Sequence, residues 1–128
     1  MPDVVVIDYA DILAPPSGKL EFRDQINRTW QHLRQLSQVF HCLVVTATQS
    51  NAAAYQRETL DRGNFSEDKR KLAHVTGMAG INVTVAEKEI GVCRLNWVVA
   101  REKEFSPRHC VHVAGCLPLA NPSVRSVF

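Results

Sequence analysis

The stretch that decides the fold is residues 1–13, MPDVVVIDYADIL, at the start of the 128-residue chain. Branched apolar residues follow one another from Val4 to Ile7, without the polar alternation of a strand that faces water on one side. This pattern predicts a strand buried on both faces, which is typical of a parallel sheet. Asp8 follows at the carboxyl end, where open α/β sheets bind their ligands. We therefore expect an α/β fold and take Asp8 as the first candidate functional residue.

A helix and a second strand come next. Over residues 22–40 the apolar side chains recur in steps of four and three, which predicts an amphipathic helix. The apolar stripe consists of Phe22, Ile26, Trp30, Leu33, Leu36 and Phe40. Residues 42–47, CLVVTA, again form a continuous apolar run and predict a second buried strand. We expect the two strands to be parallel, side by side or one strand apart, with the Trp30 helix packed on one face.

The rest of the chain is predicted to be mostly strand. A polar cluster at residues 48–51, TQSN, ends the second strand, and residues 52–66 show no apolar periodicity. The elements expected after it are a helix over 66–74, strands over 81–85, 92–100 and 110–113, a charged turn at 87–89, and an irregular tail over 117–128. We therefore predict a mainly parallel sheet with flanking helices and a C-terminal β portion. One domain spans 1–116, and the tail spans 117–128.

Composition narrows the classes of function. The net charge is +2, from 15 basic and 13 acidic residues, so any nucleic-acid site must be local. No stretch approaches the roughly 20 apolar residues of a membrane span, and the first residues do not resemble a secretory leader. We expect a cytoplasmic protein with no membrane partner. The four cysteines lack the spacing of a disulfide framework, and no Cys-x-x-Cys knuckle supports a zinc site.

Two polar residues at strand ends point to nucleotide chemistry. P-loop ATPases place an acid at the end of one buried strand to position Mg²⁺, and a polar side chain at the end of another to sense the γ-phosphate. Asp8 and Gln49 occupy such places. A strand-end aspartate is also found in phospho-acceptor domains, phosphatases and metal-dependent nucleases. We interpret Asp11 as a residue that caps a helix or turn rather than as a second metal ligand.

Three segments carry a resemblance to a known family. PDVVVIDYADIL, CLVVTATQSN and AGINVTVAEKEIGVCRLNWVVAREKEF resemble the RecA-like ATPase domain of replicative DNA helicases, the DnaB family. The resemblance implies that Asp8 is the Walker B residue that holds Mg²⁺, and that Gln49 is the catalytic sensor of ATP. It further implies that Arg101 reaches the ATP of a neighbouring subunit in a homo-oligomeric ring hexamer. ATP and Mg²⁺ are the cofactors expected of the complete protein.

The same resemblance implies a path for single-stranded DNA. In the family, the loops after the Walker B and sensor strands face a central channel and grip the strand. These loops correspond to residues 14–20 and 52–66. Lys19, Arg57 and Arg62 are the candidate phosphate contacts, because cationic side chains supply most of the affinity for a nucleic-acid backbone.

The sequence departs from the family pattern at two places. It contains no GxxxxGK[ST] phosphate loop, so we expect the C-terminal part of a larger ATPase domain, inactive and without bound nucleotide by itself. The late strand ends in Val99, Ala100 and Arg101 where the family has Lys-x-Arg, which leaves Lys103 as a second candidate for the neighbouring ATP. Two alternatives stay open: a non-catalytic DNA-binding or assembly module, and an aspartate-dependent phosphoryl-transfer or metal enzyme using Asp8 and Asp11.

Overall fold

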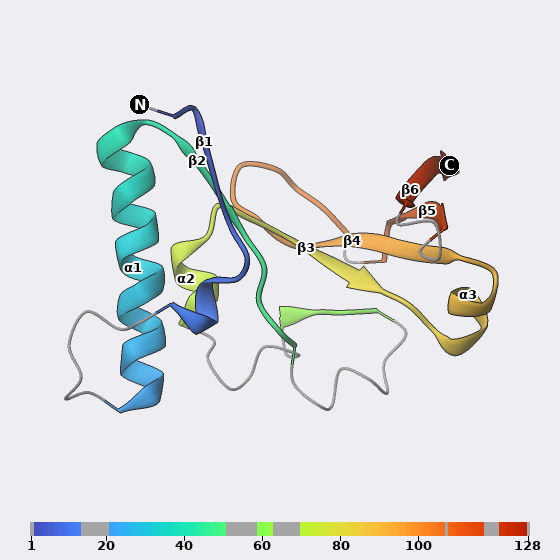
Figure 1. The fold of residues 1–128 in the computed structure, drawn as a ribbon, viewed down its shortest axis with the longest axis horizontal. Helices are drawn as coiled ribbons and strands as arrows, with labels where there is room; N and C mark the ends of the chain where they lie inside the picture. The colour runs from blue at the N-terminus through green and yellow to red at the C-terminus, as the bar shows by residue number, and fades with distance from the viewer. Residues whose placement is uncertain are drawn as a thin grey trace. The chain divides into compact units, whose positions relative to one another are not determined.

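The chain is divided between two compact units. The structure, a computed structural model, describes residues 2–13, 21–50, 59–62, 70–106, 108–116 and 121–127, the last of these as backbone alone. Residues 1–50 and 67–75 belong to the N-terminal unit, and residues 51–66 and 76–128 belong to the C-terminal unit. Figure 1 draws the ribbon of both.

The N-terminal unit is built on two parallel strands. Its elements are β1 (Val4–Ile7), the 3-10 turn η1 (Ala10–Ile12), α1 (Phe22–Phe40), β2 (Leu43–Thr46) and α2 (Lys71–His74). β1 and β2 pair directly, with Val4 opposite Leu43 and Ile7 opposite Thr46 (Figure 1). The parallel, adjacent arrangement predicted from the sequence is confirmed.

Helix α1 packs on this pair through the middle of its apolar stripe, because Phe22 and Phe40 at the two ends are 69% and 45% exposed. Trp30 is only 4% exposed, as the periodicity predicts, and the helix contacts β2. The helix ends at His41, which adopts the left-handed conformation (φ 49°), and the N–H of Cys42 donates to the carbonyl of Ser37 at 3.2 Å. Helix α2 is held against α1 by polar contacts, including a 2.9 Å hydrogen bond between His74 and Asn27.

One face of the parallel pair is exposed, which corrects the prediction that β1 is buried on both faces. Val4 and Val6 are 49% and 73% exposed, and their register partners Leu43 and Val45 are 59% and 43% exposed. Because side chains alternate along a strand, these residues share one face, which we call the open face. The opposite face is half-buried. The continuous apolar run thus lacks a covering layer on one side among the described residues.

The C-terminal unit is an antiparallel sheet in the order β3-β4-β5-β6. Its elements are β3 (Gly77–Asn82), α3 (Val85–Glu89), β4 (Val92–Ala100), β5 (Cys110–Cys116) and β6 (Asn121–Val127). The prediction of β4 is confirmed at both ends. The mainly parallel sheet is confirmed only for β1 and β2, because all three strand pairings in this unit are antiparallel.

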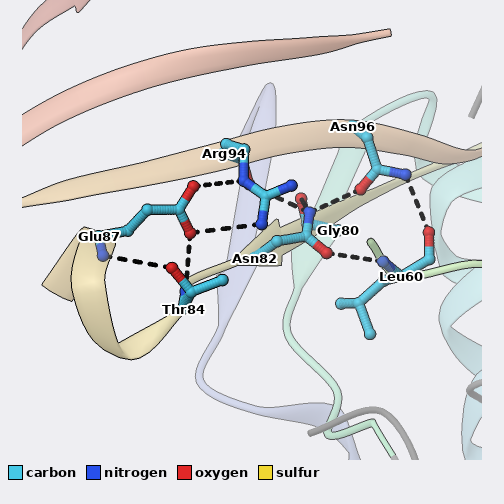
Figure 2. Close-up of polar contacts among 7 residues, drawn as sticks. All are labelled: Leu60, Gly80, Asn82, Thr84, Glu87, Arg94 and Asn96. Carbon is cyan, nitrogen blue, oxygen red and sulfur yellow. Dashed lines mark hydrogen bonds and ion pairs between the residues drawn. The ribbon is translucent and has the colours of Figure 1, made fainter. Parts of the chain in front are cut away.

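Three local predictions for this unit were wrong. The strand expected over 81–85 begins earlier, at Gly77, and ends at Asn82. The charged turn at 87–89 is part of helix α3, which begins with a capping box: the N–H of Glu87 donates to the Thr84 hydroxyl, and the N–H of Thr84 donates to the Glu87 carboxylate (Figure 2). The tail over 117–128 is not irregular throughout, because β6 occupies most of it. Pro122 fits there because β6 is an edge strand, where a missing N–H is tolerated.

A glycine makes the turn between α3 and β4. Gly91 has a φ of +69°, which side chains rarely adopt, and a Cβ there would lie 2.6 Å from the carbonyl oxygen of Gly115. The two backbones meet at this point, because the N–H of Gly115 donates to the Gly91 carbonyl at 2.8 Å. Elsewhere, the four cysteines are free thiols, and none of the helices described is long and apolar enough to cross a membrane.

Candidate functional site

Asp8 and Gln49 follow the carboxyl ends of the two paired strands. Asp8 comes directly after β1, and Gln49 lies three residues beyond the end of β2. Since β1 and β2 are parallel and in register, both residues leave the sheet at the same edge. Both are exposed. The arrangement matches the strand-end geometry that the sequence predicts for these two candidates.

A threonine joins the two strand ends. The N–H of Ala10 donates to the hydroxyl of Thr46 at 2.8 Å, and this hydroxyl donates to the carbonyl of Ile7 at 2.9 Å. Ala10 is fully buried. The backbone on both sides of Asp8 is therefore held to the end of β2, so the position of Asp8 depends on its neighbour strand.

A buried polar cluster supports the same edge; we call it the Asp11 network. One carboxylate oxygen of Asp11 accepts a hydrogen bond from the indole N–H of Trp30 at 3.0 Å. The other accepts from the Thr48 hydroxyl at 2.6 Å and from the Lys71 ammonium at 2.9 Å. Lys71 also donates to the Thr48 hydroxyl at 3.0 Å and lies 5.9 Å from the centre of the Trp30 ring. The network thus connects η1, α1, α2 and the residue before Gln49.

The network keeps Asp11 ionised. Burial alone raises the pKa of this carboxyl, but the hydrogen bonds from Thr48, Lys71 and Trp30, with the charge of Lys71, outweigh it and hold the pKa below its usual range. The Asp11 and Lys71 side chains are only 14% and 11% exposed. A carboxylate that is already occupied in this way is a poor metal ligand, but the predicted capping role of Asp11 is wrong, because its side chain binds Trp30, Thr48 and Lys71 instead.

Sequence reasoning missed the partners of Asp11. Lys71 lies 60 residues away along the chain, so no local pattern connects the two. Trp30 did carry a signal: an indole placed in a core stripe needs an acceptor for its N–H. A search for a buried acceptor would have turned to the polar residues at the strand ends.

The residues at this edge fit Mg²⁺ bound together with a nucleotide. Among the described residues, Asp8 makes no hydrogen bond or ion pair with its side chain, and no group of three or more His, Cys, Asp or Glu side chains could hold a metal. Mg²⁺ is commonly held by one or two carboxylates, with waters and substrate phosphates completing the octahedron. A lone exposed aspartate suits that role and does not suit a site made wholly of protein ligands.

The remaining candidates lie in the C-terminal unit or outside the described residues. Arg101 is exposed and follows β4 directly, and its backbone N–H donates to the carbonyl of Thr76 at 3.0 Å. Arg62 is also exposed, and its Nε donates to the carbonyl of Val98 at 3.4 Å. Lys19 and Arg57 lie outside the described residues.

Comparison with known proteins identifies the fold. Eight solved chains match, and two of them are described as an ATPase domain and as a DnaB-like replicative helicase. One, an ATPase domain, superposes with a TM-score of 0.81 at 15% identity over 95% of this chain. The other, a DnaB-like replicative helicase described with its interactions with primase, superposes with a TM-score of 0.75 at 15% identity over 88% of this chain. No family model and no curated protein matches the sequence.

The chain spans less than half of either neighbour. It covers 44% of the first structure and 28% of the second. Its mixed α/β fold, with a small parallel pair and an antiparallel sheet, is thus similar to part of each of these two structures.

Proposed function

We propose that this chain is the part of a replicative DNA helicase ATPase domain that carries the Walker B aspartate Asp8 and the sensor Gln49. The observation that carries the proposal is the direct parallel pairing of β1 and β2, which brings both strand ends to one edge. The fold shared with DnaB-like helicase domains supports the same reading.

Each side chain has a distinct role in this proposal. Asp8 orders the waters around Mg²⁺, and Gln49 contacts the γ-phosphate or the attacking water. When bound, Mg²⁺ would neutralise part of the negative charge on the phosphates. The Asp11 network supports Gln49 indirectly, because the hydroxyl of the preceding residue, Thr48, is held by both Asp11 and Lys71.

The phosphate loop must come from the rest of the domain. The sequence contains no GxxxxGK[ST] segment, and more than half of each structural neighbour has no counterpart in this chain. The open face offers a surface for that remainder, since parallel sheets are normally covered on both faces. Four apolar side chains stand there at 43% to 73% exposure.

The proposal extends to a shared site and to DNA. Arg101 acts on the ATP of the next subunit in a homo-oligomeric ring, for which its exposed place after β4 is suitable. Arg62, with Lys19 and Arg57, contacts the phosphates of single-stranded DNA. An exposed arginine near a backbone phosphate adds affinity that depends on salt.

The test is ATP hydrolysis by a complete ring that contains this chain together with the part holding the phosphate loop. Asp8→Asn is expected to abolish turnover, because an amide cannot order Mg²⁺ as a carboxylate does. Asp3→Asn is the matched control: Asp3 is also exposed but lies at the opposite end of β1. Equal activity of the two variants would refute the assignment. The isolated chain is expected to show no hydrolysis in either form.

One observation favours a second function, a non-catalytic DNA-binding or assembly module. The chain lacks the segment that cradles the β- and γ-phosphates. In that case Asp8→Asn would leave every activity of the complete assembly unchanged, while Arg62→Gln would still weaken DNA binding. A phosphoryl-transfer enzyme using Asp8 and Asp11 is disfavoured, because Asp11 already accepts hydrogen bonds from Trp30, Thr48 and Lys71.

A further inference from the structure

Two asparagines of the C-terminal sheet are buried and bonded to each other. Asn82, at the end of β3, is 6% exposed, and Asn96, within β4, is 4% exposed. The amide Nδ2 of Asn82 donates to Oδ1 of Asn96 at 2.8 Å and to the carbonyl of Arg94 at 3.2 Å (Figure 2). Buried amides need partners for both ends, and we call these two residues the asparagine pair.

The amide groups that the two asparagines do not use for each other bind the main chain of one residue, Leu60. The N–H of Leu60 donates to Oδ1 of Asn82 at 2.6 Å, and Nδ2 of Asn96 donates to the carbonyl of Leu60 at 2.9 Å. Figure 2 shows both contacts converging on this residue. The two amides therefore supply Leu60 with the donor and the acceptor that a neighbouring strand would otherwise provide.

A glycine makes room for this approach. A Cβ on Gly80 would lie 2.8 Å from Oδ1 of Asn96, 3.1 Å from Cβ of Leu60 and 3.2 Å from a methyl group of Val98. Only a residue without a side chain leaves this space. The close contact of Leu60 with the sheet thus depends on Gly80 as well as on the asparagine hydrogen bonds.

Arg62 is two residues beyond this anchor and touches the same sheet. Its Nε donates to the carbonyl of Val98, which is 2% exposed on β4, while the residue itself is exposed. The hydrogen bond uses one of the five N–H donors of the guanidinium. Because Leu60, two residues earlier, is fixed to the sheet, the guanidinium group of Arg62 can be held at a defined position on the surface of the sheet.

We propose that Asn82 and Asn96 are positioning residues that fix Leu60 and thereby hold Arg62 for a phosphate of single-stranded DNA. The DNA part of this inference rests on the proposed function. The positioning part does not, because it concerns contacts within the chain itself. An ordered arginine loses less conformational freedom on binding, so its phosphate contact is stronger.

The experiment measures binding of a fluorescently labelled oligo(dT) to the full 128-residue chain over a range of salt concentrations. One phosphate contact contributes about 0.7 to the slope of log K against log salt for single strands. Arg62→Gln is expected to reduce the slope by about that amount. Asn82→Leu and Asn96→Leu are expected to give the same reduction, and Asn82→Leu with Arg62→Gln should give no further one.

Two variants serve as controls. Arg108→Gln removes the same charge from another exposed position in this unit and should leave the slope unchanged. Gly80→Ala keeps both asparagines in the sequence but places a Cβ 2.8 Å from Oδ1 of Asn96 and 3.1 Å from Cβ of Leu60, so it should displace Leu60 and reproduce the effect of Asn82→Leu. It keeps the inference testable if an asparagine variant fails to fold.

Hydrogen exchange separates the two parts of the inference. The Leu60 amide and the Arg62 Nε–H should exchange slowly in the parent chain, and both should exchange faster in Asn82→Leu. An unchanged Arg62 signal, or a slope that depends on Arg62 but not on the asparagine pair, would overturn the positioning role. A parent chain that binds no oligo(dT) would overturn the DNA part of the proposed function, while the exchange data would still decide the positioning part.

Discussion

The Asp11 network and the asparagine pair, one in each unit, bury polar side chains by different means. The N-terminal unit buries an ion pair between Asp11 and Lys71, completed by neutral donors. The C-terminal unit buries the asparagine pair, which carries no charge. Desolvating charges costs far more than desolvating amides, and the cost is recovered only with the partner in place. The Asp11 network should therefore be sensitive to charge and pH, and the asparagine pair to hydrogen-bond geometry alone.

The largest effect is expected from breaking the ion pair. Lys71→Met leaves Asp11 in a mostly buried position without its cation, and should destabilise the chain by about 3 kcal/mol. Arg70→Met is the matched control, since its ion pair with Asp24 is exposed (45% and 51%) and should be worth less than about 1 kcal/mol. Urea unfolding measures both. Equal costs for the two variants would contradict the assignment of a buried pair.

A smaller effect is expected from the asparagine pair. Asn82→Leu removes the acceptor for the N–H of Leu60 and the donor to Oδ1 of Asn96, and should cost about 1–3 kcal/mol. The double variant Asn82→Leu with Asn96→Leu should cost less than the sum of the single changes, because paired amides are then replaced by paired apolar groups. Strict additivity in urea unfolding would show that the two amides are independent.

Acid should further distinguish the Asp11 network from the asparagine pair. The folded pKa of Asp11 lies below its unfolded value, so its stabilisation is complete above the unfolded pKa and is lost as the pH falls through the folded pKa. The asparagine pair does not titrate. The Asp11→Asn variant should therefore lose less stability on acidification than the parent chain, whereas Asn82→Leu should lose as much as the parent. Parallel curves for Asp11→Asn and the parent would contradict the lowered pKa.

Glu87 adds an acid-sensitive contact to the C-terminal unit. The hydrogen bond from Arg94, with that from the Thr84 backbone, lowers the pKa of Glu87 to about 2. This contact persists at neutral pH and weakens as the pH falls from the usual carboxylate range toward that value. Its acid sensitivity must be separated from the behaviour of the asparagine pair, which lies in the same unit.

The smallest effect is expected at the capping box of α3. Thr84→Ala removes the hydroxyl that accepts from the Glu87 N–H at 3.2 Å, and should cost about 1 kcal/mol. Thr84→Ser keeps a hydroxyl and should cost a fraction of that. Thermal unfolding of the two variants provides the check, and an equally large loss for serine would show that the methyl group, not the cap, matters.

The sequence predicted best those helices and strands whose own residue pattern identifies them. The apolar runs placed β1, β2 and β4, and the stripe through Trp30 placed α1, because burial imposes a period on the residues. Helix α3 was missed although Thr84 and Glu87 have the spacing of a capping box. Strand β6 was missed because Pro122 suggests a break, and only pairing with β5 makes it an edge strand.

The candidate site was predictable only in part. Asp8 and Gln49 could be chosen from strand ends alone, because parallel strands bring their carboxyl ends together. The contacts of Lys71 with Asp11, and of Asn82 with Leu60, join residues 60 and 22 positions apart. Such contacts depend on how the segments pack, and no local period encodes them. The exposure of Val6 likewise depends on which layers cover the sheet.

Rings assembled from two variants give the sharpest test of the proposed shared ATP site. In the proposal, Asp8 lies in the ATP site of one subunit and Arg101 reaches the site of its neighbour. In complete rings, Asp8→Asn and Arg101→Ala should each abolish ATP hydrolysis. Rings assembled from a mixture of the two variants should regain part of it, because some interfaces then combine an intact Asp8 with an intact Arg101. Mixed rings that assemble but stay inactive, or hydrolysis by the isolated chain, would contradict the account.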